Sequence, residues 1–282
     1  MTATPVNEKM RGPASDYALG YSESEHERLI RQAALIAPTT ERLFREAGIG
    51  PGQRVLDLGS GMGDVFMLAA MPVRPRSGRW RGRDAGSIAR AKVRVTEAGL
   101  RNLTFTQGDV NQIVADQPFD AIVGRFILMF LSDPLSVLKS VARLVRPGGV
   151  LAFQEPSWAG MLAMAMRLPL WSCVRSTIHE TFLHAGANPE MGLDLHSKFQ
   201  QIGLTAPSMR LDMLLSTDAR FTGIVLGVLC SIRPLAEKCG VFLAELGDFD
   251  TLPERIQSEI TATGAVVSVV PIVSAWSRKP EH

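Results

Sequence analysis

The chain contains 282 residues, of which 46% are hydrophobic and 21% are charged. This composition is typical of one large globular α/β domain, or of one domain with a sizeable insertion. The formal net charge of +2 argues against a strong electrostatic attraction to nucleic acid or to an anionic membrane. The three cysteines form no C-x-x-C pair, which argues against a disulfide framework or a zinc site: Cys173, Cys230 and Cys239.

The N-terminal residues lack the apolar segment of a signal peptide, since Glu8, Lys9 and Arg11 stand in its place. No uninterrupted apolar run reaches the roughly 18 residues that suggest a membrane span. We therefore expect a cytoplasmic protein with no membrane partner. Residues 1–15 are polar and contain two prolines, so they are expected to form a flexible tail.

Helical spacing of apolar residues begins at Ser24. It predicts a helix that ends at Pro38 and a second helix over Thr39–Ala47. A short strand is expected over Arg54–Leu58, followed by a turn that contains three glycines and by a helix over Asp64–Ala70.

Helices and strands then alternate until about residue 155, which predicts a parallel, doubly wound sheet. The expected elements are a helix over Gly86–Ala98, a strand over Leu103–Thr106, a strand over Phe119–Val123, a helix over Pro134–Leu144 and a strand over Val150–Gln154.

The alternation stops after Pro156. Residues 161–187 and 217–260 have helical patterns, and a strand is expected within 207–215. A valine-rich last strand is expected over Ala265–Trp276, where Pro271 indicates an edge position or a bulge.

The glycines at positions 59, 61 and 63 follow a predicted strand and open a predicted helix. Without β-carbons, such a turn lets the backbone approach a ligand closely, while the helix N-terminus presents free N–H groups to it. This pattern alone does not separate dinucleotides from S-adenosylmethionine. Asp57 separates them, because a carboxylate beside the turn disfavours a pyrophosphate and tolerates a ligand that carries a sulfonium and an ammonium.

The sequence V-L-D-L-G-S-G-M-G-D over 55–64 resembles the first motif of the class I S-adenosylmethionine-dependent methyltransferases. Two further segments extend the resemblance over about residues 40–155. Gly108-Asp109-Val110 follows the third strand, where such enzymes place an acid near the adenine, and Arg146-Pro147-Gly148-Gly149 precedes the fifth strand.

The resemblance implies a Rossmann-like α/β fold with a mostly parallel seven-stranded sheet and a helical cap inserted in the C-terminal half. The expected organisation is a cofactor-binding core with N-terminal helices over 16–156, a cap over 157–206, and the last strands over 207–282 with a second helical insertion at about 217–262.

The resemblance also implies a set of S-adenosylmethionine-binding residues. Tyr17 or Tyr21 is expected to cover the methionine part of the cofactor, or else to pack an N-terminal helix on the core. Arg125, after the fourth strand, could pair with the methionine carboxylate, with an acidic substrate, or with Asp57 or Asp109. The implied set is Tyr21, Asp57, Gly59, Ser60, Gly61, Gly63, Asp84, Gly108, Asp109, Val110 and Arg125.

One segment departs from the family pattern, because the second strand usually ends in an acid that holds the ribose hydroxyls. Residues 71–83 contain two prolines, five arginines and one β-branched residue, whereas a buried parallel strand is normally a near-continuous apolar run. Alignment on the following helix puts Gly82 where the acid belongs. Three explanations remain: Asp84 serves after a register shift, the ribose is held otherwise and more weakly, or the coding sequence carries a local compensated frameshift.

The candidate catalytic bases are Glu155, at the end of the fifth strand, and His179, on a helix of the cap. A solvent-exposed loop acid and a helix-surface histidine are the alternatives for these two. His184 and His196 are further candidates, and no metal site is expected. The methionines and tryptophans of 158–171 predict an apolar pocket wall, or else ordinary cap core.

The predicted function is therefore methyl transfer to a small, partly apolar molecule at an oxygen or nitrogen. Nucleic acid is disfavoured as a substrate because Gly124-Arg125-Phe126-Ile127 stands where an N-P-P-Y-type motif is common. A homodimer is left open. The alternatives are a methyltransferase-like protein that binds cofactor with weak or no turnover, and a nicotinamide-dependent dehydrogenase, which Asp57 disfavours.

Overall fold

The computed structural model describes residues 23–59, 63–65, 77–82, 85–100, 103–108, 110, 113–164 and 167–281. Several predicted site residues lie outside this part of the chain, as does most of the predicted helix Asp64–Ala70: Tyr17, Tyr21, Ser60, Gly61, Asp84 and Asp109.

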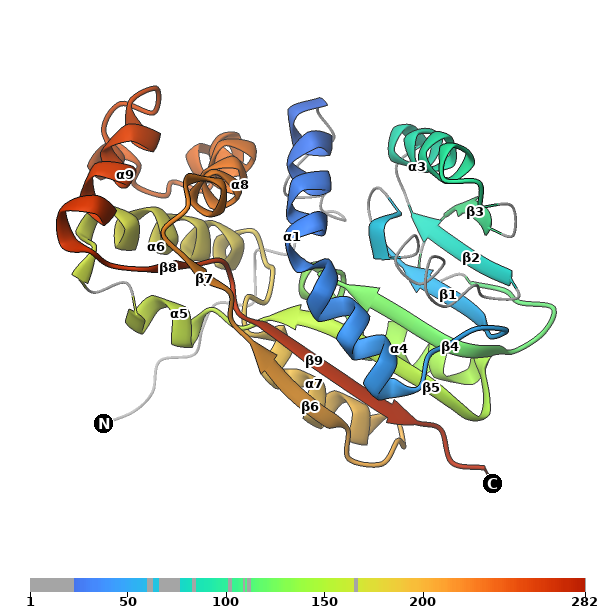
Figure 1. Cartoon of the computed structure of the whole chain (residues 1–282). Helices are drawn as coiled ribbons and strands as arrows, with labels where there is room; N and C mark the ends of the chain where they lie inside the picture. The colour runs from blue at the N-terminus through green and yellow to red at the C-terminus, as the bar shows by residue number, and fades with distance from the viewer. Residues whose placement is uncertain are drawn as a thin grey trace, which may run out of the picture.

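Within the described residues, the main sheet has the strand order β3-β2-β1-β4-β5-β9-β6 (Figure 1). Neighbouring strands from β3 to β5 are parallel, whereas β9 is antiparallel to both of its neighbours. The order reverses at β1, which is the doubly wound, Rossmann-like arrangement that the alternating pattern predicts. The strands are β1 (Arg54–Leu58), β2 (Ser77–Gly82), β3 (Leu103–Gln107), β4 (Phe119–Arg125), β5 (Val145–Pro156), β6 (Ser208–Asp212) and β9 (Ile272–Arg278).

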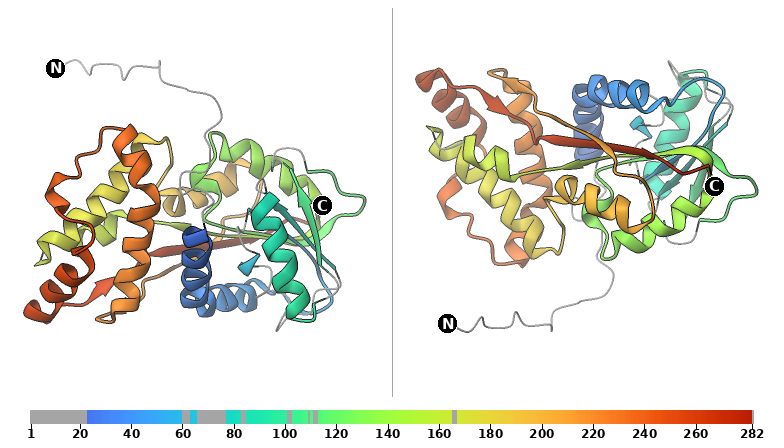
Figure 2. Two further views of the ribbon diagram at one scale, coloured as in Figure 1. Left: turned by 90° about the horizontal axis from the view of Figure 1, so that it is seen from above. Right: turned by 90° about the horizontal axis from the view of Figure 1, so that it is seen from below.

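Helices cover both faces of this sheet. Figure 2 shows α1 and α3 on one face, and α4 and α7 on the other. These helices are α1 (Glu23–Ala47), α3 (Ala85–Glu97), α4 (Pro134–Leu144) and α7 (Met191–Gln201).

A second group of helices lies beyond the carboxyl end of β5 (Figure 1). It consists of α5 (Ala159–Met164), α6 (Pro169–His184), α8 (Ala219–Lys238) and α9 (Leu252–Thr263), with the 3₁₀ turn η4 (Ala244–Leu246) and the short strand pair β7 (Leu215–Ser216) and β8 (Val267–Ser268).

The core is formed on both faces of the sheet. Leu56 and Leu58 of β1 pack into one buried cluster, while Val55 packs into the other. In β5, Leu151 and Val150 divide in the same way. A parallel strand that is buried on both faces requires an apolar run, and β1, β4 and β5 have one.

The predicted break at Pro38 is wrong, because α1 runs unbroken from Glu23 to Ala47. Proline lacks a backbone N–H and crowds the preceding turn, so an interior proline bends a helix when packing prevents it from ending there. Figure 1 shows this bend in α1. Ile36 and Leu43, on either side of Pro38, are both buried, so burial of one continuous face keeps the helix intact.

The predicted edge position of the last strand is also wrong. The valine-rich stretch divides into β8 and β9, and β9 lies between β5 and β6. Pro271 precedes β9, where it need not donate a ladder hydrogen bond. Its carbonyl accepts a hydrogen bond from the backbone N–H of Ser157 at 3.0 Å. The proline therefore stands just outside an interior strand.

Among the described helices, α8 is long and apolar enough to cross a membrane by length and composition alone. In this structure it packs against α1, α6 and α9. Ile224 and Leu229 are buried, whereas Arg233 and Glu237 form an exposed ion pair. Such a division into apolar and charged faces is typical of a helix at the edge of a protein core.

Candidate functional site

The point at which the strand order reverses lies between β1 and β4. Connections leave these two strands in opposite directions, which opens a crevice at their carboxyl ends, where ligands of doubly wound sheets bind. Asp57 and Leu58 pair in register with Val123 and Gly124. The glycine turn after β1 and the segment after β4 therefore lie side by side.

Gly59 is held in a backbone conformation and a space that exclude a side chain. Its φ is +70°, and a β-carbon there would stand 2.4 Å from Cδ1 of Ile127. Gly63 has a φ of +78°, and its β-carbon would stand 3.3 Å from Cβ of Ala91. Close approach of the turn to its neighbours thus requires glycine at both positions.

Asp57 and Arg125 place opposite charges near the carboxyl ends of β1 and β4. Asp57 is fully buried. Burial lowers the pKa of the Arg125 guanidinium, and the negative charges of Asp64 and Asp57 oppose that shift. Of the partners considered for Arg125, the structure places Asp57 within electrostatic range.

A chain of hydrogen bonds fixes the Arg125 side chain. Its Nη1 donates to Thr40 Oγ1 at 3.1 Å. The Thr40 hydroxyl donates to Oε1 of Gln154 at 2.7 Å, and Gln154 Nε2 donates to Oγ of Ser274 at 3.0 Å. The chain joins β4, α1, β5 and β9, so buried polar groups of four elements orient one cation.

Glu155 holds the segment that follows β4. Its carboxylate accepts hydrogen bonds from the backbone N–H groups of Ile127, Leu128 and Met129 at 3.0, 2.8 and 3.3 Å. The side chain is fully buried, and this burial raises the pKa of Glu155 to about 7 against the opposing effect of the three N–H groups. The carboxylate thus faces backbone, and a part in proton transfer remains a prediction.

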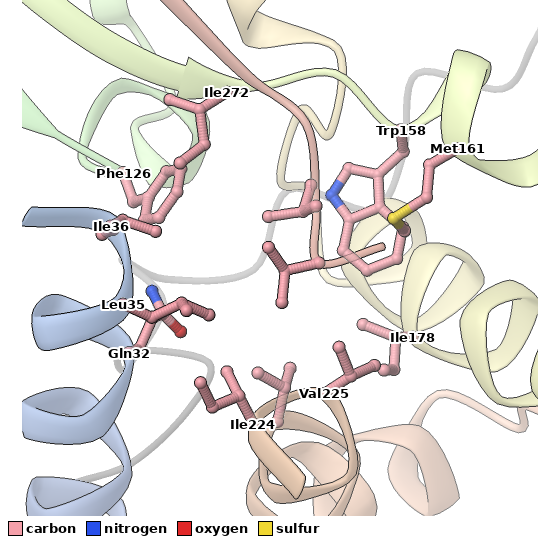
Figure 3. A pocket seen from close by; sticks show the side chains of 13 residues that line it. Gln32, Leu35, Ile36, Phe126, Trp158, Met161, Ile178, Ile224, Val225 and Ile272 are labelled. Atoms are coloured by element: carbon pink, nitrogen blue, oxygen red, sulfur yellow. The ribbon is translucent and has the colours of Figure 1, made fainter. Parts of the chain in front are cut away.

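Phe126 turns the chain out of β4. Its φ is +52°, a conformation that is costly for a bulky side chain and that is found where the surroundings enforce it. Its N–H donates to the carbonyl of Gln154 at 2.9 Å. This turn points the aromatic ring into an apolar cavity (Figure 3).

The apolar cavity lies between α1, α6, α8 and the segment before β9, with an empty volume of about 450 Å³ that includes the solvent at its mouth. Figure 3 shows Phe126 and Trp158 on opposite sides of it. Trp158 and Met161 confirm the apolar wall predicted from the sequence, whereas buried Trp171 is not part of the lining. The lining residues are Gln32, Leu35, Ile36, Phe126, Trp158, Met161, Ile178, Ile224, Val225, Val228, Val269, Val270 and Ile272.

His179 stands behind this wall. It is half-buried on α6, and its ring centroid lies 6.1 Å from that of Trp158. Burial lowers the pKa of His179, and the carboxylates of Glu190 and Glu180 oppose this. His184 and His196 are exposed. Of the three candidates, His179 is therefore the one that is half-buried and packs against a residue of the cavity wall.

The second strand forms despite its unusual composition. β2 pairs in parallel with β1 and β3, and its last residue, Gly82, is in register with Gln107. Ladder hydrogen bonds on both sides hold it. The strand ends at Gly82 and carries no acid, which agrees with the alignment that put Gly82 at the expected ribose position. After β3 the chain continues through Gly108 to Val110, which is buried in the core.

Comparison with known proteins identifies the family. A model of the methyltransferase domain matches residues 49–197, more than half of the chain. The chain is 35% identical over 118 residues to the ubiquinone/menaquinone biosynthesis C-methyltransferase of Bdellovibrio bacteriovorus, a match that covers 41% of this chain and 49% of that protein. It is 32% identical over 142 residues to the aklanonic acid methyltransferase of a Streptomyces species, covering 49% and 63%.

These matches cover less than two thirds of either relative. A solved structure from Bacillus halodurans, described as a methyltransferase, has the same fold, with a TM-score of 0.58 and 16% identity over 86% of this chain and 98% of that one. The sequence motif, the crevice at the reversal point and the family match agree: the chain belongs to the methyltransferase domain family, in its class I, S-adenosylmethionine-dependent branch.

Proposed function

We propose that this protein transfers a methyl group from S-adenosylmethionine to an oxygen or nitrogen of a small, partly apolar molecule. One observation carries the proposal. The segment after β4 borders both the glycine turn, through Ile127 against Gly59, and the apolar cavity, through Phe126. A donor held at the turn and an acceptor held in the cavity would therefore meet at this segment.

The residues present fit the cofactor. The turn at Gly59 and Gly63 is a cradle that a β-carbon would fill, and the buried carboxylate of Asp57 suits a ligand with cationic groups. When bound, S-adenosylmethionine supplies a methyl group already activated by its sulfonium. The other residues of the proposed cofactor set are Tyr21, Ser60, Gly61, Asp84, Gly108, Asp109, Val110 and Arg125.

The protein's own contribution is alignment of the reactants and exclusion of water. We assign the exclusion of water to α5, α6 and α8, which would form a cap over the acceptor. The cavity walls that α6 and α8 supply are aliphatic, so they would shield an acceptor bound there from water.

His179 is our candidate for the base that takes a proton from the acceptor. Because burial lowers its pKa below the ordinary 6.5, the imidazole is neutral at pH 7 and can accept a proton. His179→Ala is expected to lower kcat roughly a hundredfold with little change in the KM for S-adenosylmethionine. Initial rates from pH 5 to 9 measure this, and the variant should lose the acidic limb of the profile.

The matched control for this change is His184→Ala, which removes an exposed histidine from the end of the same helix. Its rates should equal those of the unmodified protein. Equal turnover in both variants would remove His179 as the base.

A weak-binding alternative is favoured by β2, which ends at Gly82 without an acid. Two hydrogen bonds to a carboxylate are worth roughly 1.5–3 kcal/mol each, so their loss weakens cofactor affinity by about a hundredfold or more. Gly82→Glu is expected to raise the affinity for S-adenosylhomocysteine at least about tenfold, measured by calorimetry. Gly78→Glu, at the start of the same strand, is the control, and an unchanged Kd for Gly82→Glu would show that the ribose is held elsewhere.

The proposed function itself is tested by calorimetry with S-adenosylmethionine, S-adenosylhomocysteine and NADH. Heat with the two sulfur ligands and none with NADH is the expected result. Turnover of methyl-tritiated S-adenosylmethionine with a panel of phenols and amines then separates an enzyme from a protein that only binds. Absence of heat with both sulfur ligands would reject the proposal.

A further inference from the structure

A buried arginine on α6 has no described partner. Arg175 is 1% exposed, and its Nε and Nη2 donate no hydrogen bond. Burial alone lowers the pKa of its guanidinium, to about 10, with no carboxylate acting on it. At neutral pH the group is therefore a buried cation without a counter-ion in the described part of the chain.

Arg175 lies on α6, the helix that supplies Ile178 to the wall of the apolar cavity. Ile178, which lines the cavity, is one helical turn further along the same helix, and residues three apart are neighbours on a helix face. Trp171, one turn in the other direction, is buried as well. The cation thus lies on the buried face of α6, the face that also carries Trp171 and Ile178.

Two indole N–H groups are also buried without a described hydrogen-bond partner. Nε1 of Trp158 and Nε1 of Trp171 are buried and have no hydrogen-bond partner among the described residues. Trp158 packs on α6 at His179 and Phe182, and Figure 3 shows its indole nitrogen turned toward the interior of the cavity. Unpaired donors therefore occur on α6 and on the tryptophan that packs against it, and all of them require an acceptor.

Leaving such groups unpaired is expensive. A buried hydrogen-bonding group without a partner costs about 1–3 kcal/mol, and more when it is charged. The lining of the cavity is aliphatic and aromatic apart from Gln32, whose amide oxygen already accepts a hydrogen bond from Nη1 of Arg28. A group that brings acceptor oxygens and one negative charge would satisfy the guanidinium and an indole together.

We propose that Arg175 binds a carboxylate carried by the methyl acceptor, so that the substrate is an apolar molecule with one acidic end. A planar carboxylate can take two parallel hydrogen bonds from a guanidinium. A single cation matches a single negative charge, which favours a carboxylate over a phosphate dianion. The inference rests on the proposed function in taking the cavity as the acceptor site.

The experiment compares 4-phenylbutyrate with its amide, 4-phenylbutanamide, which has the same shape without the charge. Both are added to protein loaded with S-adenosylhomocysteine, and binding is measured by calorimetry and by thermal unfolding. The acid should bind and raise Tm, and the amide should do neither. Arg175→Met should weaken binding of the acid roughly 10- to 100-fold while leaving the ligand-free Tm unchanged or higher, because a buried unpaired charge has been replaced by an apolar chain.

Arg220→Met is the matched control, since Arg220 is 89% exposed on α8, and it should bind the acid like the unmodified protein. Equal binding of acid and amide by the unmodified protein would overturn the proposal without any variant. Undiminished binding of the acid by Arg175→Met would overturn it as well. Heat from S-adenosylhomocysteine, recorded in every sample, separates these outcomes from failure of the proposed function, which would abolish that heat.

Discussion

Gly59→Ala is expected to abolish measurable binding of S-adenosylhomocysteine, a loss of affinity of roughly a thousandfold. Two effects add at this position. A φ of +70° costs an L-residue about 1–2 kcal/mol, and the new β-carbon would stand 2.4 Å from Cδ1 of Ile127. The turn and the segment after β4 cannot both keep their places, and the proposed cofactor site lies between them. Calorimetry measures the loss.

The control for backbone strain is Gly99→Ala. Gly99 has nearly the same φ, +69°, but nothing lies within 4 Å of its would-be β-carbon. This variant should lose about 1 kcal/mol of stability and keep its affinity for the ligand. Shortening the opposing side chain, in the double variant Gly59→Ala with Ile127→Ala, should recover part of the binding. Full affinity in Gly59→Ala would show that the ligand does not lie against this turn.

Glu155→Gln is expected to change how stability depends on pH. The buried carboxyl group has a pKa of about 7, against 4.5 in the unfolded chain. Between these values the folded protein keeps a proton that the unfolded chain releases. This group therefore stabilises the fold fully below about pH 4.5, and that stabilisation, about 3 kcal/mol, is lost as the pH rises to 7.

An amide does not titrate, so in the variant this group no longer contributes to the change of the free energy of unfolding with pH. It should be about 1–3 kcal/mol less stable than the unmodified protein at pH 5, because the amide NH₂ faces backbone donors. By pH 8 it should match or exceed the unmodified protein. Urea unfolding at pH values between 4.5 and 8 measures both quantities.

Glu190→Gln is the matched control. Glu190 also accepts backbone N–H groups, those of Trp158 and Ala159, both at 2.8 Å, but it is only half-buried. Its variant should be destabilised by the loss of these hydrogen bonds, so a comparison of the two variants separates lost hydrogen bonds from the titration of Glu155. A Glu155→Gln protein with an unchanged slope would mean that Glu155 is ionised throughout this range, held by its three N–H donors.

Most of the helices and strands between β1 and β5 could be predicted from the sequence because the local sequence signals at each element indicate the same structure. Alternating apolar segments, glycine turns and a proline at the first turn of α4 identify β1, α3, β4, α4 and β5 without knowledge of the neighbours. The predictions at Pro38 and Pro271 failed for a common reason. A proline indicates only that its own residue cannot donate a backbone hydrogen bond. The packing of Ile36 and Leu43 depends on residues far away in the chain, and so does the pairing of β9 with β5 and β6.

The site was only partly predictable for a related reason. Asp57 and the glycines are recognised by their spacing along one turn. The roles of Thr40 and Gln154 in holding Arg125 depend on contacts between α1 and β5, separated by 114 residues. Arg175 gives no sequence signal at all, because an arginine in a helix is usually solvated, and only its burial distinguishes it. Polar residues whose partners are distant require the folded structure.

The placement of β9 inside the sheet has a consequence for biosynthesis. Residues 272–278 are made after both β5 and β6, yet both strands pair with them. A ribosome-bound chain can pair strands β1 to β5 early, but β6 has no strand to join until residues 272–278 emerge. Pairings between such distant segments close slowly, and an unpaired edge invites wrong partners in the meantime. We therefore expect the part of the chain that contains β6 to become compact late in translation. Pulse proteolysis of stalled ribosome-bound chains measures this delay.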